Sequence, residues 1–367
     1  MNDAPTLTST ARARFSPRSL FALAPRREDH WVALRTGLGI ALPLLVLLAL
    51  HRVDLAPYAV FGAFTGIYSR VTGHLDRLLM QLKASALMWG VILLAWCSGA
   101  FVVRGATSTT GLWLLVACTS LVAGACTVLA FLLRLRPTGP LFHIFAFAAL
   151  SSLPAQPRIG DAMFTVSATM VLGLLLGQTG RLSPVRRTPW TVSPGPGAPP
   201  RFVAAAWREG AAHLVAASLA GAIAAALSGP LGMGHTYWAM VAAVVPLVGH
   251  TVTHRVVRGV HRVLGTAAGL VPMIAIVALH PSPWVAVMII GAVQFLTEMF
   301  VVRNYFWGQF FVTPLALVGI SLGAPLTGGI LYDRGLETLI GAVVGIAVVL
   351  VLARISPLPP RRVHVMG

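Results

Sequence analysis

Long apolar runs separated by short polar segments recur from residue 30 to residue 353. A helix needs about 20 apolar residues to cross a hydrocarbon core of about 30 Å. Twelve runs reach or approach that length, so the sequence predicts an all-α polytopic membrane protein with about 12 transmembrane helices. The predicted spans are residues 30–50, 57–70, 84–102, 111–133, 140–153, 162–180, 210–229, 236–249, 263–280, 283–302, 305–323 and 335–353.

Three of these spans are short and are flanked by Gly or Pro, namely residues 57–70, 140–153 and 236–249. Irregular or short membrane segments are tolerated where protein or a cavity surrounds them instead of lipid. We therefore expect these three spans to lie inside the bundle and to be relevant to function.

A proline-rich segment divides the chain at residues 181–208 and is predicted to be a cytoplasmic linker. It separates a first six-helix repeat, residues 30–180, from a second one, residues 209–354. Basic segments flank the repeats at residues 1–29 and 355–367, and both are predicted to be cytoplasmic.

The two halves resemble each other in sequence. The second span begins with Tyr58-Ala59-Val60 in the first half and with Tyr237-Trp238-Ala239 in the second. Because each half contains an even number of spans, the two repeats are predicted to be parallel, about an axis along the membrane normal.

Composition agrees with a membrane protein, since 57% of residues are hydrophobic and only 10% are charged, against roughly a quarter charged in soluble domains. The net charge is +17, yet 22 of the 27 Lys and Arg fall on one side of the predicted spans if the N-terminus is cytoplasmic. This asymmetry predicts that both termini are cytoplasmic and that the protein lies in the inner (plasma) membrane. The basic residues are expected to attract anionic membrane lipids, and no nucleic acid partner is expected.

No enzymatic, metal or cofactor motif emerges from the sequence. The three cysteines form no CxxC pair, and His250 and His254 lack a third metal ligand nearby. A GxSxG pattern begins at Gly319, but it ends an apolar helical run and lacks the strand-turn-helix context of a hydrolase. We therefore expect no enzyme, no cofactor and no bound metal.

Several motifs of the second half resemble one family. The relevant segments are Tyr237-Trp238-Ala239, the basic stretch from His254 to Arg262 that runs into Leu264–Gly269, Glu298 followed by Arg303-Asn304-Tyr305, Thr313-Pro314 and Leu336–Gly341. In their order and spacing they resemble the FUSC family of fusaric acid resistance protein-like, or aromatic acid exporter, membrane proteins. The resemblance covers residues 209–354 and implies an inner-membrane transporter of the efflux type that acts on aromatic carboxylates or similar anions. The first half lacks the Arg-Asn-Tyr and Thr-Pro elements.

Glu298 is a carboxylate inside the tenth span, and such a residue is a candidate functional site because an unpaired charge in the membrane is costly. Its expected partner is Arg303. We interpret Glu298 as a proton-coupling carboxylate, and the alternative is a structural ion pair near the interface.

Arg255, Arg258 and Arg262 lie on a segment predicted to connect a short span to the next long one. Guanidinium groups bind carboxylates through paired hydrogen bonds. These three residues are therefore candidates to recruit an anionic substrate, and the alternative is that they bind lipid phosphate.

Five further polar residues are candidate transport residues. Asn304, Gln309 and Thr313 can donate hydrogen bonds to a carboxylate, or they can join neighbouring helices. Glu337 is placed to line an outer vestibule or to favour a helix start, and His143 titrates in a range that suits proton coupling unless it only packs.

These features predict a transporter that exports small organic anions by alternating access between the halves, with proton coupling. Two alternatives are a passive anion channel and a non-transporting membrane scaffold for envelope assembly. The sequence leaves the oligomeric state open.

Overall fold

The computed structural model describes residues 20–25, 29–68, 70, 73–103, 108–192, 202–322 and 328–355. Helices and connecting turns make up these ranges, and no strand occurs within them. Most of the two predicted basic termini and the middle of the predicted linker lie outside the described residues.

Eight helices are long and apolar enough to cross a membrane. They are α3 (Asp29–Ala49), α5 (His74–Cys97, continued by the π-helical η4, Ser98–Val103), α6 (Thr109–Leu132), α8 (Ile159–Gln178), α9 (Phe202–Leu231), α11 (Val252–Leu279), α12 (Pro283–Phe300) and α14 (Gly328–Ile355). The prediction of a multi-pass, all-helical membrane protein is thereby confirmed.

The other four predicted spans form shorter helices. They are α4 (Ala56–Ala63, between the 3-10 turns η2, Val53–Leu55, and η3, Phe64–Ile67), α7 (Leu141–Ser151), α10 (Tyr237–Ala243) and α13 (Tyr305–Ser321). Eight of the twelve predicted spans are therefore helices long enough to cross a membrane, and the count of twelve remains a prediction. Helices α4, α7 and α10 are largely buried and lie inside the bundle as expected.

Four helices begin earlier than predicted. Helix α5 begins at His74, α9 at Phe202, α11 at Val252 and α14 at Gly328. The predicted boundaries were wrong there because a charged residue interrupts an apolar run without ending a helix, since Arg and Lys are good helix formers. As a result, part of the predicted linker and the whole basic segment before residue 263 are helical.

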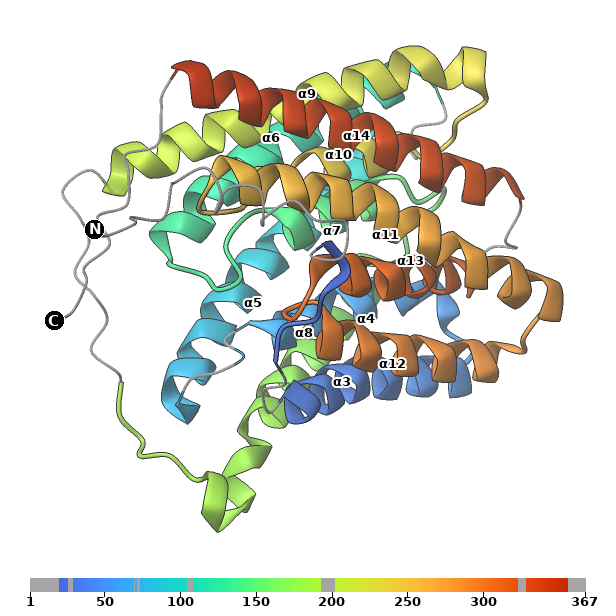
Figure 1. Cartoon of the computed structure of the whole chain (residues 1–367). Helices are drawn as coiled ribbons and strands as arrows, with labels where there is room; N and C mark the ends of the chain where they lie inside the picture. The colour runs from blue at the N-terminus through green and yellow to red at the C-terminus, as the bar shows by residue number, and fades with distance from the viewer. Residues whose placement is uncertain are drawn as a thin grey trace, which may run out of the picture.

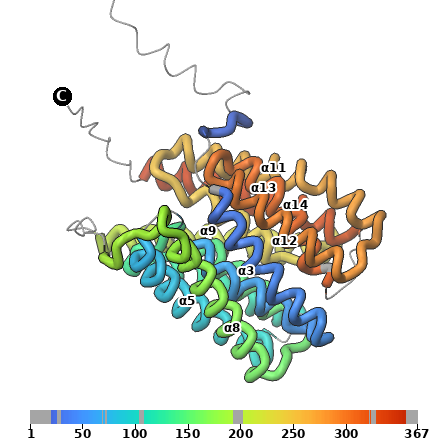
Figure 2. Tube along the Cα trace, turned by 90° about the horizontal axis from the view of Figure 1, so that it is seen from below, coloured from blue at the N-terminus to red at the C-terminus, as the bar shows by residue number. Residues whose placement is uncertain are grey.

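The two halves, α3–α8 and α9–α14, contact each other through equivalent helices. The first helix of each half packs against the fourth helix of the other, as α3 does on α12 and α9 on α6 (Figure 1). Figure 2 shows α5 and α8 on one flank and α11, α13 and α14 on the other, with α3 and α12 between them.

The order of contacts within each half also matches. The second helix packs against the sixth, α4 on α8 and α10 on α14, and the third packs against the fifth, α5 on α7 and α11 on α13. This matching order favours a six-helix repeat, which remains a prediction.

Small residues bring helices of the second half very close together. Gly341 and Gly345 of α14 face the backbone carbonyl oxygens of Ala239 and Ala243 on α10. A Cβ atom added at either glycine would overlap those oxygens, so the contact requires glycine on the α14 side. Close approach of this kind is how GxxxG spacings act in membrane helices.

We predict that Gly345→Val destabilises the protein, because the added side chain would separate α14 from α10. Overpacking of this kind costs about 1–3 kcal/mol, so the thermal unfolding temperature of the detergent-purified protein should fall. Gly90→Ala is the control, since no atom lies within 4 Å of a Cβ built there. A wild-type melting temperature for Gly345→Val would contradict the packing described here.

Candidate functional site

A cavity of about 2130 Å³ lies between the two halves. At one end, here called the basic end, its lining includes Lys83, Arg134 and Arg136, and at the other end it includes Asp54 and Gln156. Short helices of both halves form much of the wall between these ends. The cavity is therefore large enough for a small organic molecule and its water.

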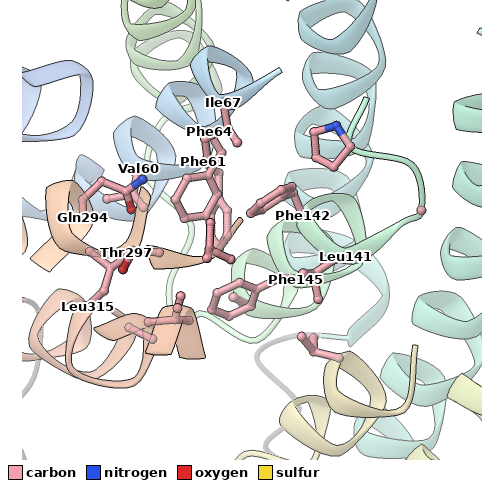
Figure 3. A pocket seen from close by; sticks show the side chains of 18 of the residues that line it. Val60, Phe61, Phe64, Ile67, Leu141, Phe142, Phe145, Gln294, Thr297 and Leu315 are labelled. Atoms are coloured by element: carbon pink, nitrogen blue, oxygen red, sulfur yellow. The ribbon is translucent and has the colours of Figure 1, made fainter. Parts of the chain in front are cut away.

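Aromatic side chains form one wall of the middle of the cavity. Phe61 and Phe64 come from α4 and η3, and Phe142 and Phe145 come from α7, while Gln294 and Thr297 of α12 face them (Figure 3). The ring centroids of Phe61 and Phe145 are 5.2 Å apart, as are those of Phe64 and Phe142. This wall offers flat apolar surface to whatever occupies the cavity.

The aromatic wall continues from the first half into the second. The ring of Phe145 stacks on Tyr237 of α10 with a centroid distance of 6.4 Å, and Tyr237 also lines the cavity. All three predicted short spans, 57–70, 140–153 and 236–249, thus contribute to the cavity wall.

Glu298 is buried in the last turn of α12, with 3% of its side chain exposed, and it lines the cavity. Its carboxylate forms an ion pair with the guanidinium of Arg70, which also donates a hydrogen bond of 2.7 Å to the Glu298 carbonyl oxygen. Gln294, one turn earlier, donates to the other carboxylate oxygen at 3.2 Å. Because Arg70 follows η3 of the first half, this ion pair joins the two halves.

The prediction that Arg303 is the partner of Glu298 is wrong. The Arg303 guanidinium instead donates to the carbonyl oxygen of Ala24 at 2.9 Å and lies over the ring of Phe300. Arg303 lies beyond the end of α12, in a turn that faces the segment 20–24, so its side chain is directed away from the carboxylate.

Asn304 begins α13 and lines the basic end of the cavity. Its side-chain oxygen accepts a hydrogen bond from the Phe306 backbone at 2.8 Å, which caps the helix. Its side-chain nitrogen donates to the carbonyl oxygens of Leu20 and Ala22 at 2.8 and 3.0 Å. Asn304 therefore holds the N-terminal segment against α13.

The three arginines of the basic stretch have separate environments. Arg255 pairs with Glu209 of α9 at 3.1 Å and is absent from the cavity lining. Arg258 lines the cavity, and its guanidinium lies 4.3 Å from the centroid of the Tyr305 ring. Arg262 is the deepest, about three turns into α11, and also lines the cavity.

Arg262 has a neutral partner. It is 3% exposed and donates a hydrogen bond of 2.7 Å to the amide oxygen of Gln309 on α13. The Gln309 amide nitrogen in turn donates to the hydroxyl groups of Thr266 and Thr313, at 3.0 and 3.4 Å. Gln309 lines the cavity, whereas Thr313 is buried behind it and supports its orientation.

The sequence analysis did not select Arg334, because the predicted last span began at residue 335. In the structure α14 begins at Gly328, so Arg334 lies nearly two turns inside the helix, is 1% exposed and lines the cavity. Its guanidinium lies 5.0 Å from the centroid of the buried Trp238 ring. The apolar residues on both sides of it, Ile330-Leu331 and Leu336, are the sequence signal that indicates a position within a span.

Glu337 and Asp333 belong to the same helix but are absent from the cavity lining. Glu337 is fully buried and accepts a hydrogen bond of 3.2 Å from the backbone nitrogen of His235. Asp333 accepts from the His235 ring at 2.9 Å and from the Gly234 backbone at 2.9 Å. These carboxylates fix the loop before α10, and neither lies at the start of α14.

His143 is fully buried in α7 and is absent from the cavity lining. Its ring lies 6.3 Å from that of Tyr68, and neither ring nitrogen has a hydrogen-bond partner among the described residues. No group of three metal-ligating side chains occurs in the described part of the chain either.

Comparison with known proteins finds a family similarity in the second half of the chain. Residues 219–348 match the family model described as fusaric acid resistance protein-like. An uncharacterized membrane protein of Bacillus subtilis (strain 168), YvaC, is 30% identical over 125 residues, which is 34% of this chain.

The match covers 20% of YvaC, so the chain spans about a fifth of the length of this relative. No solved structure matches the chain. The region matched by the family model contains α10 to α13, with Glu298, Gln309 and the three arginines of α11. Residues 219–348 are thus similar to the fusaric acid resistance protein-like family, and the resemblance read from the motifs of the second half is confirmed.

Proposed function

We propose that this protein exports small organic anions, such as aromatic carboxylates, across the inner membrane through the cavity between its halves. The observation that carries the proposal is the composition of the cavity wall, where buried arginines and aromatic rings occur together. The family similarity of residues 219–348 supports a transport role.

The charges of the wall favour an anion over a cation. Besides Arg258, Arg262 and Arg334, the lining includes Lys83 and several arginines at the basic end, against the three carboxylates Asp54, Asp76 and Glu298. Positive charge in a site of low dielectric attracts anions strongly. The aromatic wall adds surface for the apolar part of such an anion.

Alternating access requires a contact between the halves that can form and break. The ion pair between Arg70 and Glu298 is such a contact, because its partners belong to different halves. Protonation of Glu298 would remove its negative charge and weaken the pair, which would let the halves separate at this point. Proton uptake by Glu298 would thereby be coupled to movement of the substrate.

We predict accumulation of labelled benzoate in inverted inner-membrane vesicles that contain the protein, when the vesicle lumen is made acidic. The lumen corresponds to the outside of the cell, so accumulation there reports export. Passive diffusion of the neutral acid would have the opposite effect, because a weak acid collects on the more alkaline side. Vesicles without the protein are the control.

A passive anion channel is the second candidate, because residues from both ends of the bundle line one continuous cavity. A channel would let benzoate equilibrate at a rate that does not depend on the proton gradient, and it would give resolvable unitary currents in planar bilayers. Either result would contradict proton-coupled export.

We predict that Glu298→Gln removes the dependence of benzoate accumulation on the proton gradient. The amide keeps the shape and hydrogen-bonding capacity of the side chain but cannot titrate. Glu209→Gln is the matched control, because Glu209 also pairs with an arginine yet lies outside the cavity lining. Gradient-driven accumulation at the wild-type level in Glu298→Gln would exclude Glu298 as the coupling group.

A non-transporting scaffold would keep its interior dry, which the reactivity of introduced thiols can test. We predict that Glu298→Cys and Gln309→Cys, in a background without the three native cysteines, react with a water-soluble thiol reagent. Thr313→Cys should react much more slowly, because Thr313 is fully buried outside the cavity lining. Equal protection of all three positions would favour the scaffold.

A further inference from the structure

We propose that Arg262 and Arg334 form an oxoanion-binding site in the wall of the cavity. This inference rests on the proposed function, because it assigns the residues that bind the anionic group of the transported molecule. It differs from the sequence-based prediction, which gave this role to the basic stretch from Arg255 to Arg262.

Both guanidinium groups are deeply buried inside membrane-crossing helices. Arg262 is 3% exposed in α11, and Arg334 is 1% exposed in α14. A charged side chain in the membrane interior is costly and is normally paired with an opposite charge. The absence of such a partner therefore requires a physical reason.

Neither arginine forms an ion pair with a carboxylate among the described residues. Arg262 bonds to the neutral amide of Gln309, and Arg334 lies over the ring of Trp238 without a hydrogen bond to any described residue. The Nε atom of each is buried without a hydrogen-bond partner in the described part of the chain.

Three other arginines of the described residues form ion pairs with carboxylates. Arg70 pairs with Glu298, Arg255 with Glu209, and Arg52 with Asp54 and Asp161. Even the carboxylates nearest to Arg334 along the chain, Asp333 and Glu337, bond to His235 and its neighbour Gly234. Arg262 and Arg334 thus lie in the cavity wall without a carboxylate at ion-pair distance among the described residues, although Glu337 lies within electrostatic reach of Arg334.

The two charges act on the same part of the cavity. Helices α11 and α14 pack against each other, and the two guanidinium groups lie within electrostatic reach of one another. Their mutual repulsion, together with burial, makes this region unfavourable when empty and favourable for an anion. An oxoanion offers oxygen acceptors to guanidinium donors such as the two Nε atoms, which have no partner among the described residues.

The aromatic wall lies beside this pair. Tyr237 lies near Arg334, and its ring stacks on Phe145 across the boundary between the halves. A ligand with one carboxylate and a flat apolar body can therefore place its charge at the arginines and its body along Phe145 and Tyr237.

The test is ligand-induced thermal stabilisation of the purified full-length protein in detergent, with benzoate as the probe and neutral benzamide as its matched control. We expect benzoate to stabilise the wild-type protein and benzamide to have a much smaller effect. Arg262→Gln and Arg334→Gln should each weaken the apparent affinity for benzoate about tenfold or more. Arg187→Gln should retain wild-type affinity, because that exposed guanidinium bonds to the Arg181 carbonyl oxygen and lies outside the cavity lining.

Lysine variants distinguish a loss of binding from a loss of the fold. Arg262→Lys and Arg334→Lys keep the charge but not the planar fork, so we expect affinities between those of the wild type and the glutamine variants. Benzoate binding at wild-type affinity in both glutamine variants would overturn the proposal, as would stabilisation of the wild-type protein by benzamide equal to that by benzoate.

The binding-site proposal and the export proposal can be contradicted separately. If benzoate binding depends on both arginines but vesicles show no flux, the site stands and the export proposal fails. If vesicles carrying Arg334→Gln or Arg262→Gln accumulate benzoate as the wild type does, export stands and the site is wrong.

Discussion

Charge inside an apolar bundle is the constraint around which this structure is organised. An ionised side chain that leaves water for a membrane interior needs an opposite charge, several hydrogen bonds or a water-filled space. Arg70 and Glu298 satisfy one another across the two halves, and Glu209 satisfies Arg255. Arg262 and Arg334 have no such partner among the described residues, and both lie in the wall of the central cavity. The cavity is therefore the place where the protein leaves positive charge available.

Close contact between two helices positions polar side chains of the cavity wall. Gly265 and Gly269 of α11 face the carbonyl oxygens of Phe306 and Phe310 on α13, so α11 and α13 approach nearly to backbone contact. This approach brings Gln309 within 2.7 Å of Arg262 and lets Thr266 hold the amide in place. The small residues of α11 thus allow the hydrogen bonds that Gln309 forms in the cavity wall.

Much of the fold follows from hydropathy alone, and the candidate site follows only in part. The apolar runs located the helices α3 to α14 of the described residues, and the short span near Tyr237 was correctly placed inside the bundle. Glu298 was selected because a carboxylate in an apolar run is rare, and it does line the cavity. Its partner was missed, because Arg70 is 228 residues away in the chain. Arg334 was missed because hydropathy places a charge at the end of a span, although the helix continues beyond it.

The sequence by itself determined that this is a multi-pass helical membrane protein whose second half resembles the fusaric acid resistance protein-like family, because hydropathy and local motifs need no knowledge of tertiary contacts. Only the tertiary structure decided which polar residues face one another. Helix α3 packs against α12, and α6 packs against α9, across the two halves. The periodicity of the sequence does not indicate which helices form such contacts. The division of the arginines into paired and unpaired groups is likewise a property of the assembled bundle, since it depends on which carboxylate each helix brings within reach.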